Sequence, residues 1–185
     1  MMESVYYTST ATILGDLGIV WRRKDGGVTV VRIFLPAYDE GIDDLIRRSF
    51  PGAVRGSHRT AEQVGRSIQG LAAGRDVTFS EKILDMSVCG EFQKRVLCQV
   101  MRIPRGRVSA YGRVAEKSRA SRGARAVGNV LAMNPYPLII PCHRVIRSDG
   151  SLGGFGGGLK MKKDLLIMEG ITFDAKGRVP TKFLC

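Results

Sequence analysis

The stretch formed by residues 137–146 most constrains how this chain can fold. It reads Pro-Leu-Ile-Ile-Pro-Cys-His-Arg-Val-Ile, so an apolar run enters a corner, presents a thiol, an imidazole and a guanidinium, and then becomes apolar again. Pro141 fixes its own φ, donates no backbone hydrogen bond and pushes Ile140 towards extended geometry. We therefore expect Cys142 to be held between a rigid turn and a hydrophobic wall.

The charge balance indicates the kind of partner. The chain has 185 residues, which fits one large or two small domains, and its 29 Lys and Arg against 17 Asp and Glu give a net charge of +12. Such a protein is attracted to polyanions, and nucleic acid is the leading candidate. An acidic membrane surface, or no polyanionic partner at all, are the alternatives.

The sequence has no obvious targeting or membrane segment. Its first residues lack a basic region followed by an apolar one, and no apolar run approaches the length of a transmembrane helix. We therefore expect a cytoplasmic protein, nucleoid-associated in a prokaryote or nuclear in a eukaryote.

The thiols and imidazoles do not have the spacing of a metal site. They are Cys89, Cys98, Cys142, Cys185, His58 and His143. A zinc site needs ligands at short paired spacings, and a disulfide framework is unusual in a chain with a normal core. We expect reduced thiols and no metal, with Cys98 as an inert core thiol and His58 without a functional role.

The first part of the chain, residues 1–86, predicts a small α+β domain with an antiparallel sheet. Segments rich in β-branched and aromatic residues alternate with turn residues, and helical periodicity follows. The expected elements are strands at 5–13, 18–23 and 27–35, helices at 42–50 and 60–73, and an extended piece at 83–88. Thr60 is the expected cap of the second helix. We find no catalytic constellation in this part.

Residues 87–185 predict a mostly helical domain. Helical patterns cover residues 91–101, part of 108–117, about 124–133, and 159–169, where Gly170 is the expected C-cap. Two of these helices are short and are joined by a polar turn at 118–123, which is typical of a helix-turn-helix. Arginines gather in this region: Arg102, Arg105, Arg107, Arg113, Arg119, Arg122 and Arg125. Their clustering favours nucleic acid over a merely solvated face.

The second helix of this pair has an unusual face of small residues. Gly123, Ala124, Ala126 and Gly128 are small, and Arg125 is the single long cation among them. Such a face permits the close backbone approach that a narrow minor groove requires. The alternative is tight helix packing, with Arg125 merely reaching to solvent. The residues alone leave both interpretations open.

A glycine-rich loop follows the Cys142 corner. Residues 148–158 place glycines on both sides of Phe155, without the lysine and hydroxyl residue of a phosphate-binding loop. A flexible loop with one aromatic near a thiol favours a wall or lid over a flat ligand, and a plain turn is the alternative.

The thiol needs a partner if it is to react. A cysteine nucleophile requires a lowered pKa and usually a nearby base. Adjacent side chains rarely point at each other, so we expect His143 to act on Cys142 through a water rather than directly. A carboxylate would then have to orient the imidazole, and Glu169 is one candidate.

Pro141-Cys142-His143-Arg144-Val145 resembles the active-site motif of the O6-alkylguanine-DNA alkyltransferases, also called methylated-DNA–protein-cysteine methyltransferases. The resemblance extends from about Phe92 to Ile171. Its further parts occur in matching order and spacing: Tyr111, Ala124-Arg125-Ala126-Val127-Gly128, Asn134-Pro135, the glycine-rich loop and Glu169-Gly170. Residues 1–86 are only compatible in size and pattern with the variable N-terminal domain of that family.

The resemblance implies roles around the thiol. Cys142 would accept the alkyl group by in-line displacement, and Asn134 would brace the turn that carries it. His143 would activate the thiol through a water, and Glu169 would orient the imidazole.

The resemblance also implies how DNA is engaged. The helix-turn-helix would enter the minor groove with Ala124, Ala126 and Gly128 against it, and Arg125 would fill the space left by the flipped nucleotide. Tyr111 would help to rotate the phosphate and would donate to the departing guanine.

The base would then be held by backbone groups. The carbonyls of Cys142 and Val145 would bind the exocyclic amine, and the loop around Phe155 and Gly156 would close the pocket, with a backbone N–H reaching O6. Phe155 stands where some members have Tyr, and Gly156 where some have Ser. Any hydroxyl contribution at these two positions would therefore be absent.

The implied function is DNA repair by stoichiometric, irreversible transfer of the alkyl group from a flipped O6-alkylguanine to Cys142. The partner would be double-stranded DNA, the protein a monomer without a cofactor, and zinc is not expected because no cysteine precedes Cys89. Two alternatives remain. A lesion-binding module of the alkyltransferase-like kind would lack the cysteine, and a cysteine hydrolase would need a histidine distant in sequence.

Overall fold

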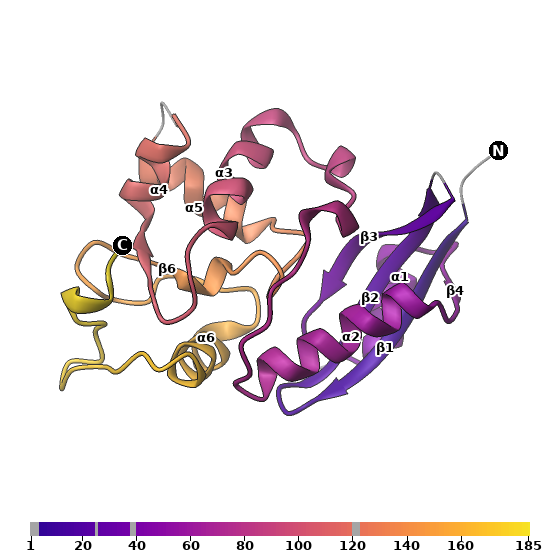
Figure 1. The fold of residues 1–185 in the computed structure, drawn as a ribbon, viewed down its shortest axis with the longest axis horizontal. Helices are drawn as coiled ribbons and strands as arrows, with labels where there is room; N and C mark the ends of the chain where they lie inside the picture. Colours follow the sequence, from indigo (N-terminus) through magenta and orange to yellow (C-terminus); the bar gives the residue numbers. More distant parts are fainter. Residues whose placement is uncertain (1–3, 25, 38–39, 120–122) are drawn as a thin grey trace. The chain divides into compact units, whose positions relative to one another are not determined.

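The structure is a computed structural model that describes residues 4–24, 26–37, 40–119 and 123–185. The chain divides into two compact units (Figure 1). One comprises Met1–Val88 with Pro135–Pro137, and the other comprises Cys89–Asn134 with Leu138–Cys185. The predicted functional domains, residues 1–86 and 87–185, remain a proposal about these units.

The first unit is built on a four-stranded sheet. Its strands are β1 (Val5–Thr12), β2 (Gly15–Lys24), β3 (Gly27–Phe34) and β4 (Val54–Arg55), in the order β3-β2-β1-β4. The three predicted strands are confirmed and pair antiparallel. The short β4 was not predicted and runs parallel to β1, because two residues carry no readable periodicity.

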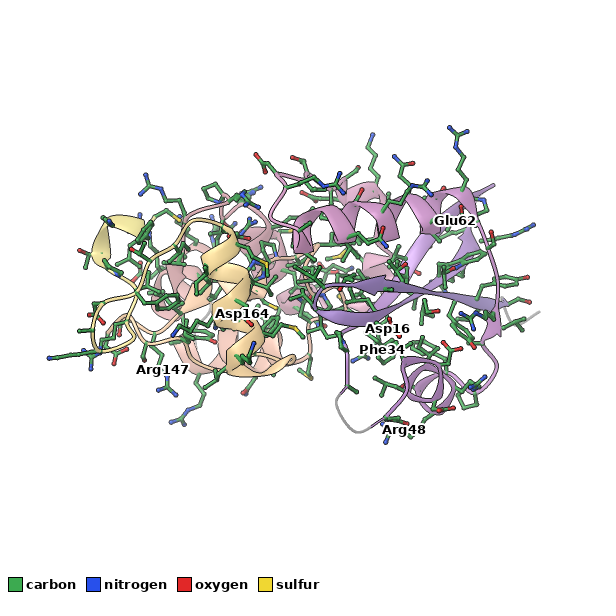
Figure 2. The ribbon with its side chains drawn as sticks, turned by 90° about the horizontal axis from the view of Figure 1, so that it is seen from below. Asp16, Phe34, Arg48, Glu62, Arg147 and Asp164 are labelled. Carbon is green, nitrogen blue, oxygen red and sulfur yellow. The ribbon has the colours of Figure 1, made fainter. Side chains whose placement is uncertain are left out.

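Helices α1 (Ile42–Ser49) and α2 (Arg59–Ala72) cover opposite faces of this sheet, as the positions of Arg48 and Glu62 show (Figure 2). Glycines allow both approaches. A Cβ at Gly18 would lie 2.5 Å from Ile46 of α1, and a Cβ at Gly65 would lie 2.5 Å from Thr10. Both distances are far below van der Waals contact, so the sheet and its helices depend on these two glycines.

The start of α2 differs from the prediction. The N-cap is His58, whose Nδ1 accepts a hydrogen bond from the backbone N–H of Thr60 at 3.2 Å. Thr60 lies inside the first turn, so its predicted role as the cap is wrong. Histidine was not expected here because Ser, Thr, Asp and Asn are the usual caps.

The predicted extended piece at 83–88 is also wrong. The chain instead forms two 3-10 turns, η1 (Glu81–Ile83) and η2 (Met86–Val88), which flank Asp85. The buried carboxylate of Asp85 accepts hydrogen bonds from the Arg22 side chain and from Ser87. The chain turns around the Asp85 carboxylate because this group pairs with Arg22, which is distant in sequence. Local periodicity does not indicate such a contact.

The second unit contains four α-helices among the described residues: α3 (Glu91–Met101), α4 (Tyr111–Lys117), α5 (Gly123–Ala132) and α6 (Gly158–Met168). These confirm the predicted helices. Gly170 follows α6 with φ +86°, a left-handed conformation that glycine adopts without strain. The four helices do not reach the length or apolar character needed to span a membrane, and neither do the other described helices.

Helices α4 and α5 pack against each other, and α3 contacts both. This arrangement agrees with the predicted helix-turn-helix, although residues 120–122 of its turn, including Arg122, lie outside the described residues. Two short strands, β5 (Ser109–Ala110) and β6 (Val145–Ile146), pair in parallel just before α4 and just after Cys142. The β5–β6 pair thus ties the start of α4 to the segment that carries the thiol.

Candidate active site around Cys142

The corner that carries the thiol is formed by the backbone. Leu138 adopts φ +73°, and the N–H of Cys142 donates to the carbonyl of Ile140 at 2.8 Å. The N–H of Arg144 donates to the carbonyl of Pro141, which closes the 3-10 turn η3 (Cys142–Arg144). Cys142 is 7% exposed. The rigid corner inferred from the sequence is therefore present, with Cys142 at its tip.

Asn134 holds this corner from the end of the preceding segment. Its side-chain amide donates to the carbonyl of Ile140 at 3.0 Å and to Sγ of Cys142 at 3.3 Å. One amide therefore fixes both the backbone before the thiol and the sulfur itself. A donor on the sulfur favours the thiolate over the thiol.

His143 pairs with the carboxylate predicted for it. Its Nε2 lies 2.9 Å from Oε1 of Glu169, and both side chains are buried. Burial alone would raise the pKa of Glu169, but the hydrogen bonds from His143 and Arg144 outweigh it and lower the pKa to about 2. An ionised carboxylate only accepts, so Nε2 carries the proton. Nδ1 is then the unprotonated nitrogen, and it has no hydrogen-bond partner among the described residues.

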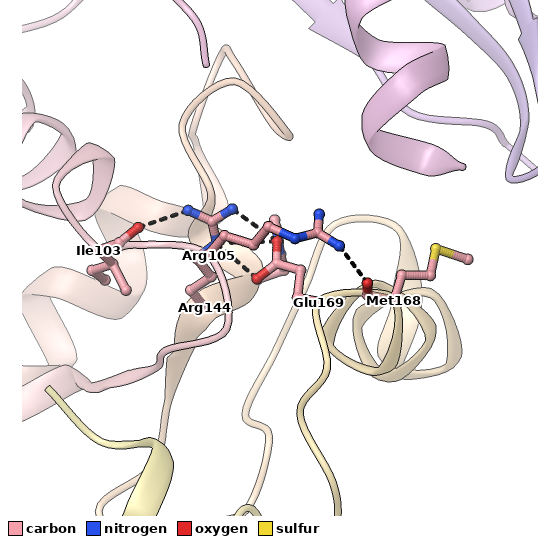
Figure 3. Close-up of polar contacts among 6 residues, drawn as sticks. Ile103, Arg105, Arg144, Met168 and Glu169 are labelled. Carbon is pink, nitrogen blue, oxygen red and sulfur yellow. Dashed lines mark hydrogen bonds and ion pairs between the residues drawn. The ribbon is translucent and has the colours of Figure 1, made fainter. Parts of the chain in front are cut away.

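Arg144 completes the arrangement on the other side of the carboxylate. Its Nε and Nη2 donate to Glu169 at 2.8–3.1 Å, and its Nη1 donates to the carbonyl of Ile103 at 2.6 Å (Figure 3). Arg105 donates to the carbonyl of Met168, immediately before Glu169 (Figure 3). Sequence reasoning included Arg144 in the motif but gave it no role. Its guanidinium fixes the carboxylate that holds His143.

The pKa values of Cys142 and His143 are both shifted so that the neutral form of each side chain is favoured. Burial raises the pKa of the Cys142 thiol, which the Asn134 hydrogen bond and the positive charge of Lys162 partly oppose. Burial lowers the pKa of His143, and Glu169 partly opposes it. A neutral imidazole with an unprotonated Nδ1 is the form that accepts a proton from a thiol.

Lys162 was not identified from the sequence. Its side chain is fully buried, and its ammonium donates to the carbonyls of Val145, Leu152 and Gly154 at 2.6–3.2 Å. Burial lowers its pKa to about 8. The available signal was its place on the apolar face of α6, three residues before Leu165. A lysine at such a position is buried only when it has partners.

A hollow of about 300 Å3 opens beside the thiol. Its lining comes from α4, α5, the Cys142 corner and the glycine-rich loop, and consists of Tyr111, Gly128, Leu131, Ala132, Cys142, Gly154, Phe155 and Gly156. Five of the predicted site residues therefore share one cavity. Burial raises the pKa of Tyr111, so the phenol keeps its proton and can donate.

The position of Val145 and the conformational freedom of the glycine-rich loop differ in detail from what the sequence predicted. Val145 is buried in β6, does not line the hollow, and its carbonyl already accepts from Lys162 at 2.7 Å. A carbonyl oxygen has two lone pairs and can accept once more. The loop is less free than its glycines indicated, because Lys162 holds two of its carbonyls and a Cβ at Gly153 would lie 2.9 Å from Tyr111.

The remaining predicted residues lie on the exposed part of α5. Ala124 and Arg125 are exposed, and Ala126 is half-buried. A Cβ added at Gly128 would meet no heavy atom within 4 Å. Tight packing therefore does not account for Gly128, and the backbone of α5 is open to close approach there. Arg125 and Ala126 line a different hollow from Cys142.

The described residues contain no cluster of three or more His, Cys, Asp or Glu side chains arranged to hold a metal ion. The imidazole that follows the thiol in sequence is instead oriented by the carboxylate of Glu169, while the sulfur itself accepts from Asn134. A thiol beside a small, partly apolar pocket, next to a neutral imidazole in sequence, defines a class of protein with a candidate sulfur nucleophile.

Comparison with known proteins agrees with this class. Residues 91–171 match the family described as 6-O-methylguanine DNA methyltransferase, DNA binding domain. The chain is 40% identical over 161 residues to a methylated-DNA–protein-cysteine methyltransferase of Methanothermobacter thermautotrophicus, with 87% of this chain and 83% of that protein covered.

Solved structures are also similar. The crystal structure of the Mycobacterium tuberculosis O6-methylguanine methyltransferase has a TM-score of 0.71 at 27% identity, with 96% of each chain covered. The structure of the M. tuberculosis protein in complex with DNA has a TM-score of 0.70 at 26% identity, with 89% of this chain and 92% of that chain covered. The chain belongs to the methylated-DNA–protein-cysteine methyltransferase family, which confirms the resemblance and the α+β fold class inferred from the sequence.

Proposed function

We propose that this protein repairs DNA by direct reversal of O6-alkylguanine, chiefly O6-methylguanine, in double-stranded DNA. Cys142 takes the alkyl group, and the thioether that forms is stable, so each molecule acts once. The observation that carries this proposal is that Cys142 lines a hollow of about 300 Å3 while its sulfur accepts a hydrogen bond from Asn134.

The proposed reaction is a single displacement. The Cys142 proton passes through a water to Nδ1 of His143, and Glu169 stabilises the resulting imidazolium. The sulfur attacks the alkyl carbon, the S–C bond forms, and the bond between that carbon and O6 of guanine breaks. The guanine leaves with the bonding electrons and takes a proton donated by Tyr111. No methyl donor other than the DNA is needed, and the reaction requires no cofactor.

The base reaches the thiol by leaving the duplex. Extrusion costs a few kcal/mol and costs least for a weakened pair, which favours an O6-alkylated guanine. We propose that α5 enters the minor groove along Ala124, Ala126 and Gly128, and that Arg125 occupies the space of the flipped nucleotide. The open surface at Gly128 and the net charge of +12 support this placement.

The flipped base is proposed to lie between Tyr111 and the glycine-rich loop. The carbonyls of Cys142 and Val145 accept from its exocyclic amine, and a backbone N–H near Gly156 donates to O6, with Phe155 closing the pocket. We also propose that the protein acts as a monomer and works wherever the cell keeps its DNA.

One assay tests the proposed function. The protein is incubated with a duplex that carries O6-methylguanine, and its intact mass and peptide map are recorded. We expect a gain of one methyl group on the Cys142 peptide and no gain in Cys142→Ser. Binding without a mass change would instead indicate a lesion-binding module. Failure to bind DNA would contradict both the alkyltransferase and the lesion-binding module, and would leave a cysteine hydrolase as the alternative.

A further inference from the structure

A second, larger hollow lies in the same unit as Cys142. Its volume is about 1010 Å3. Its lining residues come from α3, the turn after α4, and α5 with the residue that follows it, and are Phe92, Arg95, Arg119, Arg125, Ala126, Asn129, Val130 and Met133. Three of these side chains are arginines, and none is a carboxylate. The hollow is therefore suited to an anionic ligand.

Helix α5 separates the two hollows. Ala126, Val130 and Met133 are spaced as neighbours on one helix face, and they line the second hollow. Gly128 and Leu131 lie on the other flank of the helix and line the hollow of Cys142. The helix proposed to enter the minor groove thus has a binding surface on each flank.

The charges of the second hollow are exposed and oriented. Arg95 lies with its guanidinium 5.7 Å from the centre of the Phe92 ring, a cation–π contact that limits its freedom. Glu91 does not line the hollow; its carboxylate pairs with Lys94 at 2.7 Å, and the charge of Arg95 adds a smaller effect to that of Lys94 in lowering its pKa. Arg119 is exposed and lies two residues after the end of α4.

The two strands of a duplex form the two walls of its minor groove. A helix seated in that groove therefore has one strand on each flank. The flank of α5 that opens onto Cys142 must face the strand that delivers the alkylated base. The opposite flank then faces the complementary strand, and this is the flank that carries Arg95 and Arg119.

We propose that the second hollow binds the DNA strand opposite to the one that carries the substrate base, with Arg95 and Arg119 paired to its phosphates. The proposal rests on the proposed function, because it assumes that α5 occupies the minor groove. Under this proposal the protein recognises double-stranded DNA through two surfaces. The hollow with Cys142 meets the strand that carries the alkylated base, and the second hollow meets the other strand.

The test compares Arg95→Gln with Lys94→Gln. Both variants lose one positive charge at neighbouring positions of α3, but Lys94 does not line the hollow. Dissociation constants are measured for a duplex with O6-methylguanine and for the lesion strand alone, over a range of salt concentrations. Before these measurements, methyl transfer from the O6-methylguanine duplex to the unmodified protein is recorded, because this tests the proposed function separately.

We expect Arg95→Gln to lower the ratio of duplex to single-strand affinity roughly fivefold. For duplex binding by this variant, the slope of the logarithm of the binding constant against the logarithm of the salt concentration should become shallower by about one unit, as for one lost phosphate contact. Lys94→Gln should leave the ratio within twofold. Equal losses on duplex and single strand, or equal losses in the two variants, would overturn the proposal. If the unmodified protein transfers no methyl group, the proposed function itself fails.

Discussion

At the scale of single residues, the environment of Cys142 contains opposing effects. Burial favours the neutral thiol, while the Asn134 amide and the Lys162 ammonium favour the thiolate. The neutral His143, with Glu169 on its far nitrogen, provides a place for the proton. Burial therefore favours the protonated thiol in the free protein, and the proposed reaction has to remove this proton.

The Glu169 carboxylate should stabilise the fold in a pH-dependent way. Its pKa is about 2 in the folded protein against an ordinary 4.5, so it contributes stability above about pH 4.5 that is lost as the pH falls towards 2. We expect Glu169→Gln to lower the free energy of unfolding on the order of 3 kcal/mol at pH 7. The difference from the unmodified protein should shrink between pH 4.5 and 2.

Denaturant unfolding at several pH values measures this difference. The control is Glu116→Gln, which removes an exposed carboxylate of α4. A deficit in Glu169→Gln that does not change with pH would mean that the carboxylate acts by packing rather than by charge.

Lys162 should promote the reactivity of the thiol. Its ammonium lies among three carbonyls and its charge lowers the pKa of Cys142. We expect Lys162→Met to slow alkylation of Cys142 by iodoacetamide at pH 7 roughly tenfold, with the pH at half-maximal rate displaced upward. The neighbouring exposed Lys163→Met is the control. An unchanged pH profile in Lys162→Met would limit Lys162 to holding the loop.

At the scale of elements, the sequence predicted what periodicity encodes. Helical spacing of apolar residues predicted helices at 91–101 and 159–169, and α3 and α6 lie there. The two 3-10 turns around Asp85 were missed because its partner Arg22 is 63 residues away. Lys162 was missed for a similar reason, since Val145 and the loop become its partners only in the folded chain. Local sequence patterns therefore predict helices and strands. Charged groups whose partners are distant in sequence can be recognised only from the structure.

Substitution of Arg125 tests whether α5 helps to extrude the alkylated base from the duplex. It is exposed at the second hollow and does not line the cavity that contains the thiol. We expect Arg125→Ala to slow transfer from a methylated duplex much more, by about tenfold or above, than transfer from free O6-benzylguanine, because only the duplex requires base extrusion. Rates of Cys142 alkylation measure both. Equal losses on the two substrates would remove the role of Arg125 in extrusion.

At the scale of the whole molecule, charge and chemistry serve one task. A net charge of +12 provides affinity for phosphate that does not depend on sequence, which suits a search for rare damage. The α4–α5 pair, Cys142 and His143 belong to one compact unit, so the proposed recognition and transfer take place within the same unit. In the proposed reaction one thiol accepts one alkyl group, so each protein molecule is consumed by one repair.

The stoichiometry of repair shows whether each protein molecule acts only once. Unmodified protein is titrated against an excess of duplex that carries O6-methylguanine, and the restored guanine and the methylated Cys142 are both counted. We expect a plateau at one guanine restored and one Cys142 methylated per protein molecule. Continued repair beyond that plateau, or removal of the base from the DNA, would contradict it.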